Sequence, residues 1–433
     1  MLDIQFIRDN PDLVVEKSKQ KNVKVDVKKL LELDVERRKL LTQAEELRQQ
    51  RNRQAGDTKG QKPSDAQIES GKNLKEKLAK LEKEISEVES TYLAALKKIP
   101  NVSLNTVPVG KTEDDNVIIK TVGEPAKLGF TPKSDGELGT LHDTIDKERA
   151  TKVAGPRFAY LKGDIVRLQF AIIQFTLDTL SNEEVIAQLI KDNNLQISIK
   201  PFTPVLPPAI VKTEPYEASA RLDAEAVTYK LADDELWLNA SAEHSLCTMY
   251  MNEILDEKDL PIRYLGYATS FRREAGTYGK DTEGIFRMHQ FDKLEMEVFS
   301  TAETGLDEHR LLVAIQEYLV QKLDLPYQLI QKCTADIGKP NAQGVDINIW
   351  MPAQNQYRET HTADYMTDYQ ARRLHTRVRR GGGVELVHTN DGTAFALGRI
   401  LKAIMENYQN QDGTIRIPKI LKPYLGGKSW LNE

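Results

Sequence analysis

Residues 269–299 read TSFRREAGTYGKDTEGIFRMHQFDKLEMEVF, and this stretch decides the fold of the larger part of the chain. Its two ends have the composition of β-strands, and the glycine-containing middle predicts a long loop between them. Side chains two residues apart share one face of a strand. Leu294, Met296 and Val298 therefore predict one apolar, buried face. The stretch indicates an antiparallel hairpin that packs on a core.

The other face of this hairpin is polar. Arg272 and Glu274 are expected on one side of the first strand, and Phe291 stands among charged residues on the second. A half-buried hairpin with a solvated charged face is the simpler interpretation. However, a solvated face would rarely hold an aromatic ring. Because a guanidinium binds phosphate and a ring stacks on a base, we interpret this face as a nucleotide site.

Three segments in and beyond the hairpin resemble a known enzyme family. FRREAG (271–276), FRMHQFDKLE (286–295) and ENYQ (406–409) are similar to motifs of class II aminoacyl-tRNA synthetases, and in detail to the seryl-tRNA synthetases of bacterial type. The resemblance covers nearly the whole chain. It implies an α+β fold, with an antiparallel β-sheet catalytic domain and an N-terminal coiled-coil arm of two antiparallel helices.

The implied reaction is activation of L-serine with ATP and its transfer to tRNA(Ser). The resemblance leaves open whether tRNA(Sec) is also charged. It implies Mg²⁺ as the cofactor that accompanies ATP, and a homodimer built through the first class II motif.

Composition sets wide bounds on the partners. The chain has 433 residues and a net charge of −5, so an RNA contact needs a local basic surface and no DNA contact is expected. No apolar run is long enough for a membrane helix. Cys247 and Cys333 form neither a metal-binding spacing nor a disulfide framework. We therefore expect a cytoplasmic protein.

The first hundred residues predict a helical arm. The N-terminus predicts a short strand followed by a helix that starts at Asn10 and Pro11, and residues 27–98 predict two long helices. The second helix repeats apolar residues with heptad spacing over 74–95, whereas Arg37 interrupts the weaker seam of the first. Glycines and a proline near residue 60 break the pattern, so the helices should form an antiparallel hairpin.

The tip of this arm is basic. Such a coiled coil is by itself more often a spacer or an oligomerisation element. In seryl-tRNA synthetases, however, the arm holds the tRNA, and the basic side chains fit an RNA backbone. The residues expected to contact tRNA are Arg48, Arg51, Arg53, Lys59 and Lys62.

The domain boundary is expected after the arm. Residues 1–104 form the expected tRNA-binding domain and 105–433 the class II catalytic domain, with 102–122 as a linker. The segment PFTPVLPPAI (201–210) has the place of motif 1, with Pro204 as its proline. A final helix is expected over 394–408, after a hairpin between Arg372 and His388. The chain has no Gly-rich phosphate loop, so side chains on a sheet must bind the nucleotide.

The resemblance assigns the ATP-binding residues by position. Arg272 would bind the α-phosphate and the serine carboxylate, Glu274 the adenine amine, Arg287 the distal phosphates, Phe291 the adenine ring and Arg399 the γ-phosphate. Glu359 would hold Mg²⁺, for which oxygen ligands are suitable. The complete set expected at ATP is Arg272, Arg273, Glu274, Arg287, Phe291, Glu359, Thr360, His361, Thr362 and Arg399.

Serine selection is assigned in the same way. Glu295 would accept the hydrogen bond of the substrate hydroxyl, and Thr393 would contact the side chain from the other side. The complete serine set is Ser241, Ala242, Glu243, Arg272, Glu295 and Thr393. No histidine is assigned as a general base, because the substrate phosphate can accept the hydroxyl proton during transfer.

Four positions depart from the commonest pattern of the family. Ser241 replaces threonine, His361 places a titratable ring near ATP where serine is common, and Asp391 stands where asparagine is usual. Residues 217–221 (EASAR) replace a Gly-Thr-Gly-type segment. The last three departures bear on specificity.

Two other functions are compatible with parts of this sequence. A ligase that loads an aminoacyl adenylate onto a carrier protein should lack the long arm. A catalytically silent, RNA-binding paralogue should have lost Arg272 or Arg399, and both are present.

Overall fold

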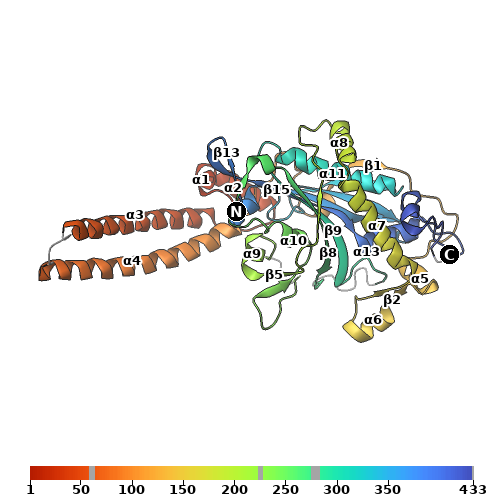
Figure 1. Cartoon of the computed structure of the whole chain (residues 1–433), viewed down its shortest axis with the longest axis horizontal. Helices are drawn as coiled ribbons and strands as arrows, with labels where there is room; N and C mark the ends of the chain where they lie inside the picture. The colour runs from red at the N-terminus through yellow and green to blue at the C-terminus, as the bar shows by residue number, and fades with distance from the viewer. Residues whose placement is uncertain (58–63, 223–227, 275–282, 432–433) are drawn as a thin grey trace. The chain divides into compact units, whose positions relative to one another are not determined.

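The computed structural model describes residues 1–57, 64–222, 228–274 and 283–431 (Figure 1). The chain forms two compact units, Met1–Val102 and Ser103–Glu433. Within the described residues, no helix combines the length and the apolar character that crossing a membrane requires.

The first unit is entirely helical. Its helices are α1 (Ile4–Asp9), α2 (Pro11–Gln20), α3 (Val27–Asp57) and α4 (Asp65–Lys98). The expected N-terminal strand is wrong, because the Asp3 side chain accepts hydrogen bonds from the backbone N–H groups of Gln5 and Phe6 and starts a helix there. As expected, α2 starts after Asn10 with Pro11 in its first turn.

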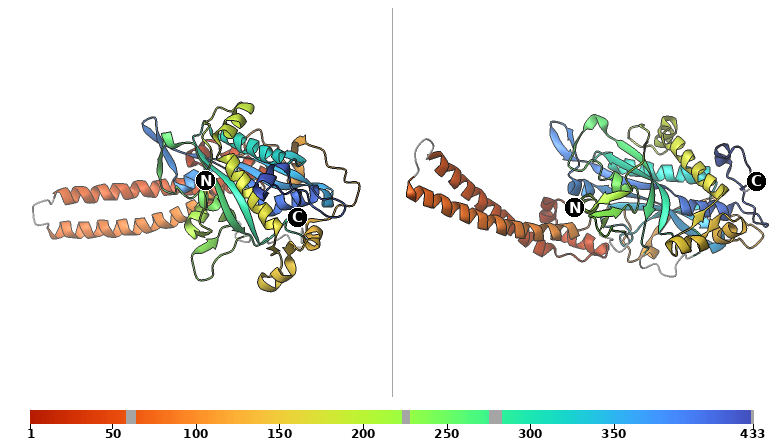
Figure 2. Two further views of the ribbon diagram at one scale, coloured as in Figure 1. Left: turned by 45° about the vertical axis from the view of Figure 1, so that its right-hand side comes forward. Right: turned by 60° about the horizontal axis from the view of Figure 1, so that its bottom comes forward.

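Helices α3 and α4 run antiparallel along each other (Figure 2). Arg37 pairs with Glu89 at 2.8 Å, and Arg48 pairs with Glu82 at 2.9 Å, so the pairing order reverses along the chain. In this part of the arm the seam buries apolar side chains, namely Ala44, Leu78 and Ile85, with Leu40, Leu47 and Leu81 packed beside them. Arg37 fits into the seam because its guanidinium also lies 5.2 Å from the Tyr92 ring centroid. The polar interruption is therefore satisfied within the arm.

The structure describes three of the five basic residues that were expected to contact tRNA. Arg51 and Arg53 are exposed, whereas Arg48 is held by Glu82. Lys59 and Lys62 lie outside the described residues.

The second unit is built on an eight-stranded sheet in the order β1-β10-β11-β12-β15-β9-β8-β4. All neighbours are antiparallel except the parallel pair β4 and β8. The strands are β1 (Val117–Val122), β4 (Thr203–Val205), β8 (Ile262–Phe271), β9 (Gln290–Ser300), β10 (Tyr327–Gln331), β11 (Gln343–Met351), β12 (Gln356–Thr367) and β15 (His388–Ala396). The α+β architecture with an antiparallel catalytic-type sheet is confirmed. The proline proposed for motif 1, Pro204, lies in β4 opposite Leu265.

One face of the sheet packs on helices. These are α7 (Asp164–Leu180), α8 (Glu183–Asp192), α11 (Gly305–Lys322) and α13 (Leu397–Asn407), and they share one apolar core with the sheet (Figure 1). Leu294, Met296 and Val298 are fully buried in this core, as the strand alternation predicted. Burying each such side chain contributes about 1.5–3 kcal/mol.

The opposite, polar face is buried as well. Lys293, Glu295 and Glu297 are only 6%, 1% and 0% exposed. Part of the segment between β4 and β8 covers this face, since Ser241 and Glu243 contact Lys293. The alternative of a solvated charged face is therefore excluded.

The remaining α-helices and strands are short. They are α5 (Asp135–Leu141), α6 (Lys147–Ala154), α9 (Thr213–Ala218), α10 (Glu243–Leu246), α12 (Tyr369–Leu374), β2 (Ile145–Asp146), β3 (Tyr160–Leu161), β5 (Ile210–Lys212), β6 (Leu236–Leu238), β7 (Ile254–Asp256), β13 (Arg377–Arg380) and β14 (Gly383–Leu386). Two expected boundaries were wrong. The last part of the supposed linker 102–122 is the edge strand β1, and the final helix begins at Leu397 because Ala396 still pairs with Lys293 of β9.

Candidate active site

The β8–β9 hairpin places the first polar residues of the site. Strand β8 ends at Phe271, so Arg272 and Glu274 do not alternate on a strand as expected. Instead the Arg272 N–H donates to the His289 carbonyl at 2.9 Å, and Glu274 adopts a left-handed φ of 50°. Such a backbone conformation is rare for a residue other than glycine, and it occurs often at functional sites. The turn brings both side chains to one cleft.

This cleft lies on the polar face of the sheet. Its lining includes most residues that the sequence assigned to ATP, and also Thr393 from the serine set. The predicted residues that line it are Arg272, Glu274, Arg287, Phe291, Glu359, Thr360, Thr362, Thr393 and Arg399.

Opposite charges alternate around the cleft. Arg287 lies 3.1 Å from Glu274, and Arg399 lies 3.1 Å from Glu359. Although desolvation opposes it, the charge of Arg399 lowers the pKa of Glu359 to about 2. The guanidinium of Arg272 lies 5.3 Å from the Phe291 ring centroid. A cleft with three arginines, two carboxylates and a ring can hold a polyphosphate together with a flat base.

Sequence reasoning missed Phe286. Its ring is buried, with the guanidiniums of Arg358 and Arg399 at 4.5 Å and 5.0 Å from the ring centroid. Cation–π contacts of this kind are worth about 0.5–2 kcal/mol each. Phe286 thus orients Arg399, and only its place in the FRMHQFDKLE segment hinted at such a role.

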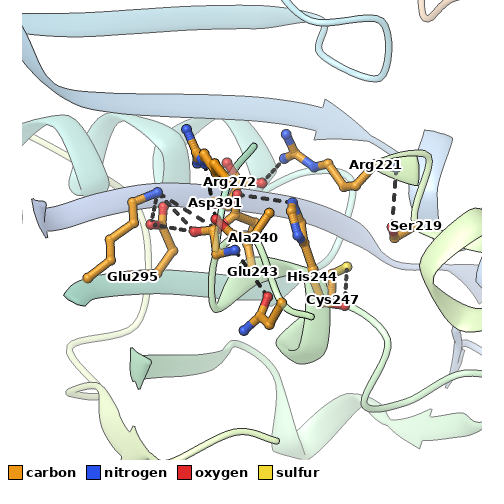
Figure 3. Close-up of polar contacts among 12 residues, drawn as sticks. Ser219, Arg221, Ala240, Glu243, His244, Cys247, Arg272, Glu295 and Asp391 are labelled. Carbon is orange, nitrogen blue, oxygen red and sulfur yellow. Dashed lines mark hydrogen bonds and ion pairs between the residues drawn. The ribbon is translucent and has the colours of Figure 1, made fainter. Parts of the chain in front are cut away.

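A second, deeper group of polar residues adjoins the cleft (Figure 3). Lys293 contacts a Glu295 oxygen closely, donates to Ser241 Oγ at 3.0 Å and lies 3.8 Å from Glu243. The hydroxyls of Ser241 and Thr393 each lie 3.4 Å from Glu295. Burial raises the pKa of Glu295 to about 8 against the opposing charge of Lys293. Lys293 was absent from the predicted set, although it shares the polar face with Phe291 and Glu295.

His244 supports Glu243 from behind. The Tyr216 hydroxyl lies 2.8 Å from His244 Nδ1, and His244 Nε2 lies 3.6 Å from Glu243. Burial lowers the pKa of His244 to about 3, so the ring is neutral. Neither Tyr216 nor His244 was predicted, because the segments that carry them give no local signal of the contact.

Three predicted residues line neither the cleft nor the deeper polar group. Arg273 is exposed, and the Ala242 side chain packs in a small apolar cluster with Leu246. The expectation of a titratable His361 ring near ATP is wrong. The His361 ring is buried, and its centroid lies 5.4 Å from that of the Phe395 ring. Burial lowers the pKa of His361 to about 3.

A strand irregularity explains the position of His361. The register between β11 and β12 shifts at Ile347 and Asn348, which face His361 and Glu359 respectively. Glu359 therefore lies on the polar face, while His361 lies with Ile347 on the core face. A β-bulge commonly redirects side chains in this manner.

Comparison with known proteins settles the family. Residues 1–103 match the model of the seryl-tRNA synthetase N-terminal domain, and residues 227–408 match the class II tRNA synthetase core domain (G, H, P, S and T). The serine–tRNA ligase of Methanospirillum hungatei is 38% identical over 445 residues, covering 100% of both chains. The chain belongs to the seryl-tRNA synthetase family. It is therefore a class II serine–tRNA ligase.

Other relatives agree with this assignment. The serine–tRNA ligase of Dictyoglomus turgidum is 39% identical over 435 residues, covering 98% of each chain. The crystal structure of seryl-tRNA synthetase from Pyrococcus horikoshii, complexed with ATP, superposes with a TM-score of 0.86 at 37% identity, covering 100% of this synthetase and 99% of that chain. Because relatives come from bacteria and archaea, the bacterial type of this synthetase stays a prediction.

Proposed function

We propose that the cleft and the adjoining polar group carry out serine activation and transfer in two steps. In the first, a serine carboxylate oxygen attacks the α-phosphorus of ATP, and the bond to pyrophosphate breaks. In the second, a terminal ribose hydroxyl of tRNA(Ser) attacks the acyl carbon, and AMP leaves. The substrate phosphate accepts the hydroxyl proton, since burial lowers the pKa of His244, the histidine beside the residues proposed to bind serine, to about 3 and keeps it neutral. The observation that carries the proposal is a cleft of arginines and a ring next to a buried group of hydroxyl and carboxylate side chains.

The residues of the cleft suit an ATP molecule. We assign Arg272 to the α-phosphate and the serine carboxylate, Arg287 to the distal phosphates and Arg399 to the γ-phosphate. Phe291 would stack on adenine, and Glu274 would accept a hydrogen bond from the adenine amine. These groups mainly position the reactants and neutralise charge, which is the principal requirement of phosphate chemistry. The ATP named with the Pyrococcus horikoshii relative supports this assignment.

Mg²⁺ fits the same cleft. Glu359 offers a carboxylate that is half exposed and ionised, and Thr362 adds a hydroxyl oxygen nearby. Magnesium usually takes one or two carboxylates and completes its shell with phosphate oxygens and water. When bound, the ion would neutralise charge on the phosphates. Glu359 is its proposed protein ligand.

The deeper polar group suits serine. Glu295 and Thr393 would contact the substrate hydroxyl, while Glu243 and Ser241 would be near the ammonium group. A site built to bind a hydroxyl rejects an analogue without it by about 10⁴-fold or more, because its own buried polar groups lose their partners. Alanine should therefore be a poor substrate.

The helical unit is proposed to bind tRNA. Residues 1–104 would form the tRNA-binding domain, with the arm over 27–98, and 105–433 the catalytic domain. The exposed Arg51 and Arg53 supply positive charge near the tip for an RNA backbone. The protein is further proposed to act in the cytoplasm as a homodimer, with the segment around Pro204 at the dimer interface.

Amino-acid-dependent pyrophosphate exchange tests this proposal. Purified protein with ATP and Mg²⁺ should exchange pyrophosphate into ATP when serine is present, but not when threonine, alanine or glycine replaces serine. Exchange with another amino acid in preference to serine would overturn the serine assignment. Absence of exchange with all four would favour a silent paralogue. Serine exchange without charging of tRNA(Ser) would instead favour a carrier-protein ligase.

A further inference from the structure

Three acidic side chains form a row across the polar face of the sheet. Asp391 of β15 lies opposite Asp364 of β12 on one side and opposite Glu297 of β9 on the other. They are 3%, 6% and 0% exposed, respectively. The row adjoins the residues proposed to bind serine, because two residues further along β15 Thr393 pairs with Glu295.

Carboxyl groups this close cannot all be ionised at low cost. Burial and the neighbouring Asp391 raise the pKa of Glu297 well above its ordinary value, which favours the protonated form of this carboxyl group. Neither of its carboxyl oxygens has a hydrogen-bond partner among the described residues. Lys332 forms an ion pair with Asp346 at 3.7 Å, and its positive charge attracts Asp364 at the other end of the row.

Arg221 provides the opposite charge for the centre of this row. Its guanidinium makes a short ion pair with Asp391 (Figure 3), and its side chain is only 17% exposed. Burial raises the pKa of Asp391 to about 7, and Arg221 opposes this rise. Without the arginine, Asp391 would therefore take up a proton more readily or repel its neighbours.

The backbone that carries Arg221 is fixed on both sides. The Arg221 N–H donates to Ser219 Oγ at 3.2 Å, and Ala220 adopts a left-handed φ of 64°. Gln370 of α12 donates to the Ser219 carbonyl at 3.0 Å and accepts from the Thr389 hydroxyl of β15 at 2.9 Å. The arginine is thus tied to the strand that bears Asp391 and Thr393 by more than its own ion pair.

Arg221 and Asp391 are also two of the places where the sequence departs from the family pattern, and in the fold they meet. We propose that these departures are one linked feature, in which Arg221 is a positioning residue that acts through Asp391 to hold Thr393 and Glu295 in place for the serine hydroxyl. The inference rests on the proposed function, because it assigns the serine hydroxyl to these two residues. Arg221 itself contacts neither serine nor ATP in this arrangement.

A double-mutant cycle on serine activation tests the proposal. Arg221→Gln should raise the KM for serine about tenfold while leaving the KM for ATP within about twofold, because residues in direct contact are coupled whereas distant sites are not. Asp391→Asn should also raise the serine KM, since it leaves Arg221 buried without its counter-charge. The double variant Arg221→Gln/Asp391→Asn replaces the ion pair by two neutral amides and should restore the serine KM to within about threefold of wild type.

Arg263→Gln is the matched control. Arg263 makes a buried ion pair with Glu308 at 2.8 Å in the same domain, with side-chain exposures of 0% and 1%. Its loss should lower the unfolding temperature without changing the ratio of the serine KM to the ATP KM. A merely structural role for Arg221 would give this same pattern.

The outcomes separate the two levels of proposal. Wild-type protein without serine-dependent exchange would refute the proposed function. If the wild type is active, three results would refute the positioning role alone. These are an unchanged serine KM in Arg221→Gln, equal rises in its serine and ATP KM values, and no rescue in the double variant. Should Arg221→Gln fail to fold, Asp391→Asn and the double variant decide the same question.

Discussion

Replacing Gly398 with alanine should disrupt the ATP cleft through a backbone clash. Gly398 lies in the first turn of α13 and has no left-handed φ, so an alanine backbone fits there. The added Cβ, however, would lie 2.6 Å from the Ile285 carbonyl oxygen. Carbon–oxygen contacts lie at about 3.3 Å or more, so α13 or the 285–287 segment must move by roughly 0.7 Å.

That movement would directly reach the residues proposed to bind ATP. Ile285 precedes Phe286, which packs on Arg399, and Arg287, which pairs with Glu274. Overpacking of this kind costs about 1–3 kcal/mol of stability. A misplacement near 1 Å can lower activity by about 10²-fold. We therefore expect kcat/KM for ATP to fall by about 10- to 100-fold, together with a lower unfolding temperature.

Pyrophosphate exchange at varied ATP and thermal unfolding measure the two effects. Gly383→Ala is the control, because its nearest neighbour to the new Cβ would be the Arg380 carbonyl oxygen at 3.8 Å. An impaired ATP KM with an unchanged unfolding temperature would show that the methyl group crowds the nucleotide directly and that the clash argument is wrong. Wild-type behaviour in both assays would refute any close approach at Gly398.

Three further predictions concern the ring, the buried acid and the arm. Phe291→Ala should raise the KM for ATP by about 5- to 150-fold, because base stacking is worth about 1–3 kcal/mol. Phe291→Tyr should stay near wild type, and an unchanged alanine variant would exclude stacking. The raised pKa of Glu297 means that the native state keeps a proton which the unfolded state loses above its ordinary value of 4.5. Stability should therefore fall as pH rises from there toward the folded pKa, by up to about 1.4 kcal/mol per pH unit. Thermal unfolding of Glu297→Gln, which carries no titrating proton, should be less pH-dependent, and an equal slope would mean that Glu297 is ionised. Deleting 27–98 should spare exchange and abolish tRNA charging, and Leu81→Asp in the seam should act similarly. Full charging by either variant would make the arm a spacer.

The local periodicities of the sequence were a good guide to the fold. Alternation in β9 predicted that Leu294, Met296 and Val298 are buried, because successive side chains of a strand point to opposite faces. The heptad spacing of α4 predicted its buried seam, because residues at heptad spacing lie on one face of a helix. The N-terminal strand failed because one capping side chain, Asp3, outweighed a weak strand pattern.

Much of the candidate site was also predictable. Arg272, Phe291, Glu359 and Arg399 belong to recognisable segments, and they meet at one cleft. Residues outside those segments could not be found in this way. Phe286 acts only through the arginines that pack on it, and such packing depends on segments far apart in the sequence.

The sequence by itself determined most of the helices and strands, because their periodicity follows from backbone geometry over a few residues. The residues proposed for the nucleotide came from segments that resemble the motifs of the family. Only the tertiary structure decided which polar residues are buried and which side chains they contact. The register shift between β11 and β12 places Glu359 in the cleft and His361 in the core. The pairing of Arg221 with Asp391 joins residues 170 positions apart. Long-range contacts of this kind depend on strand register and on the covering segment, and neither leaves a periodic signal in the chain.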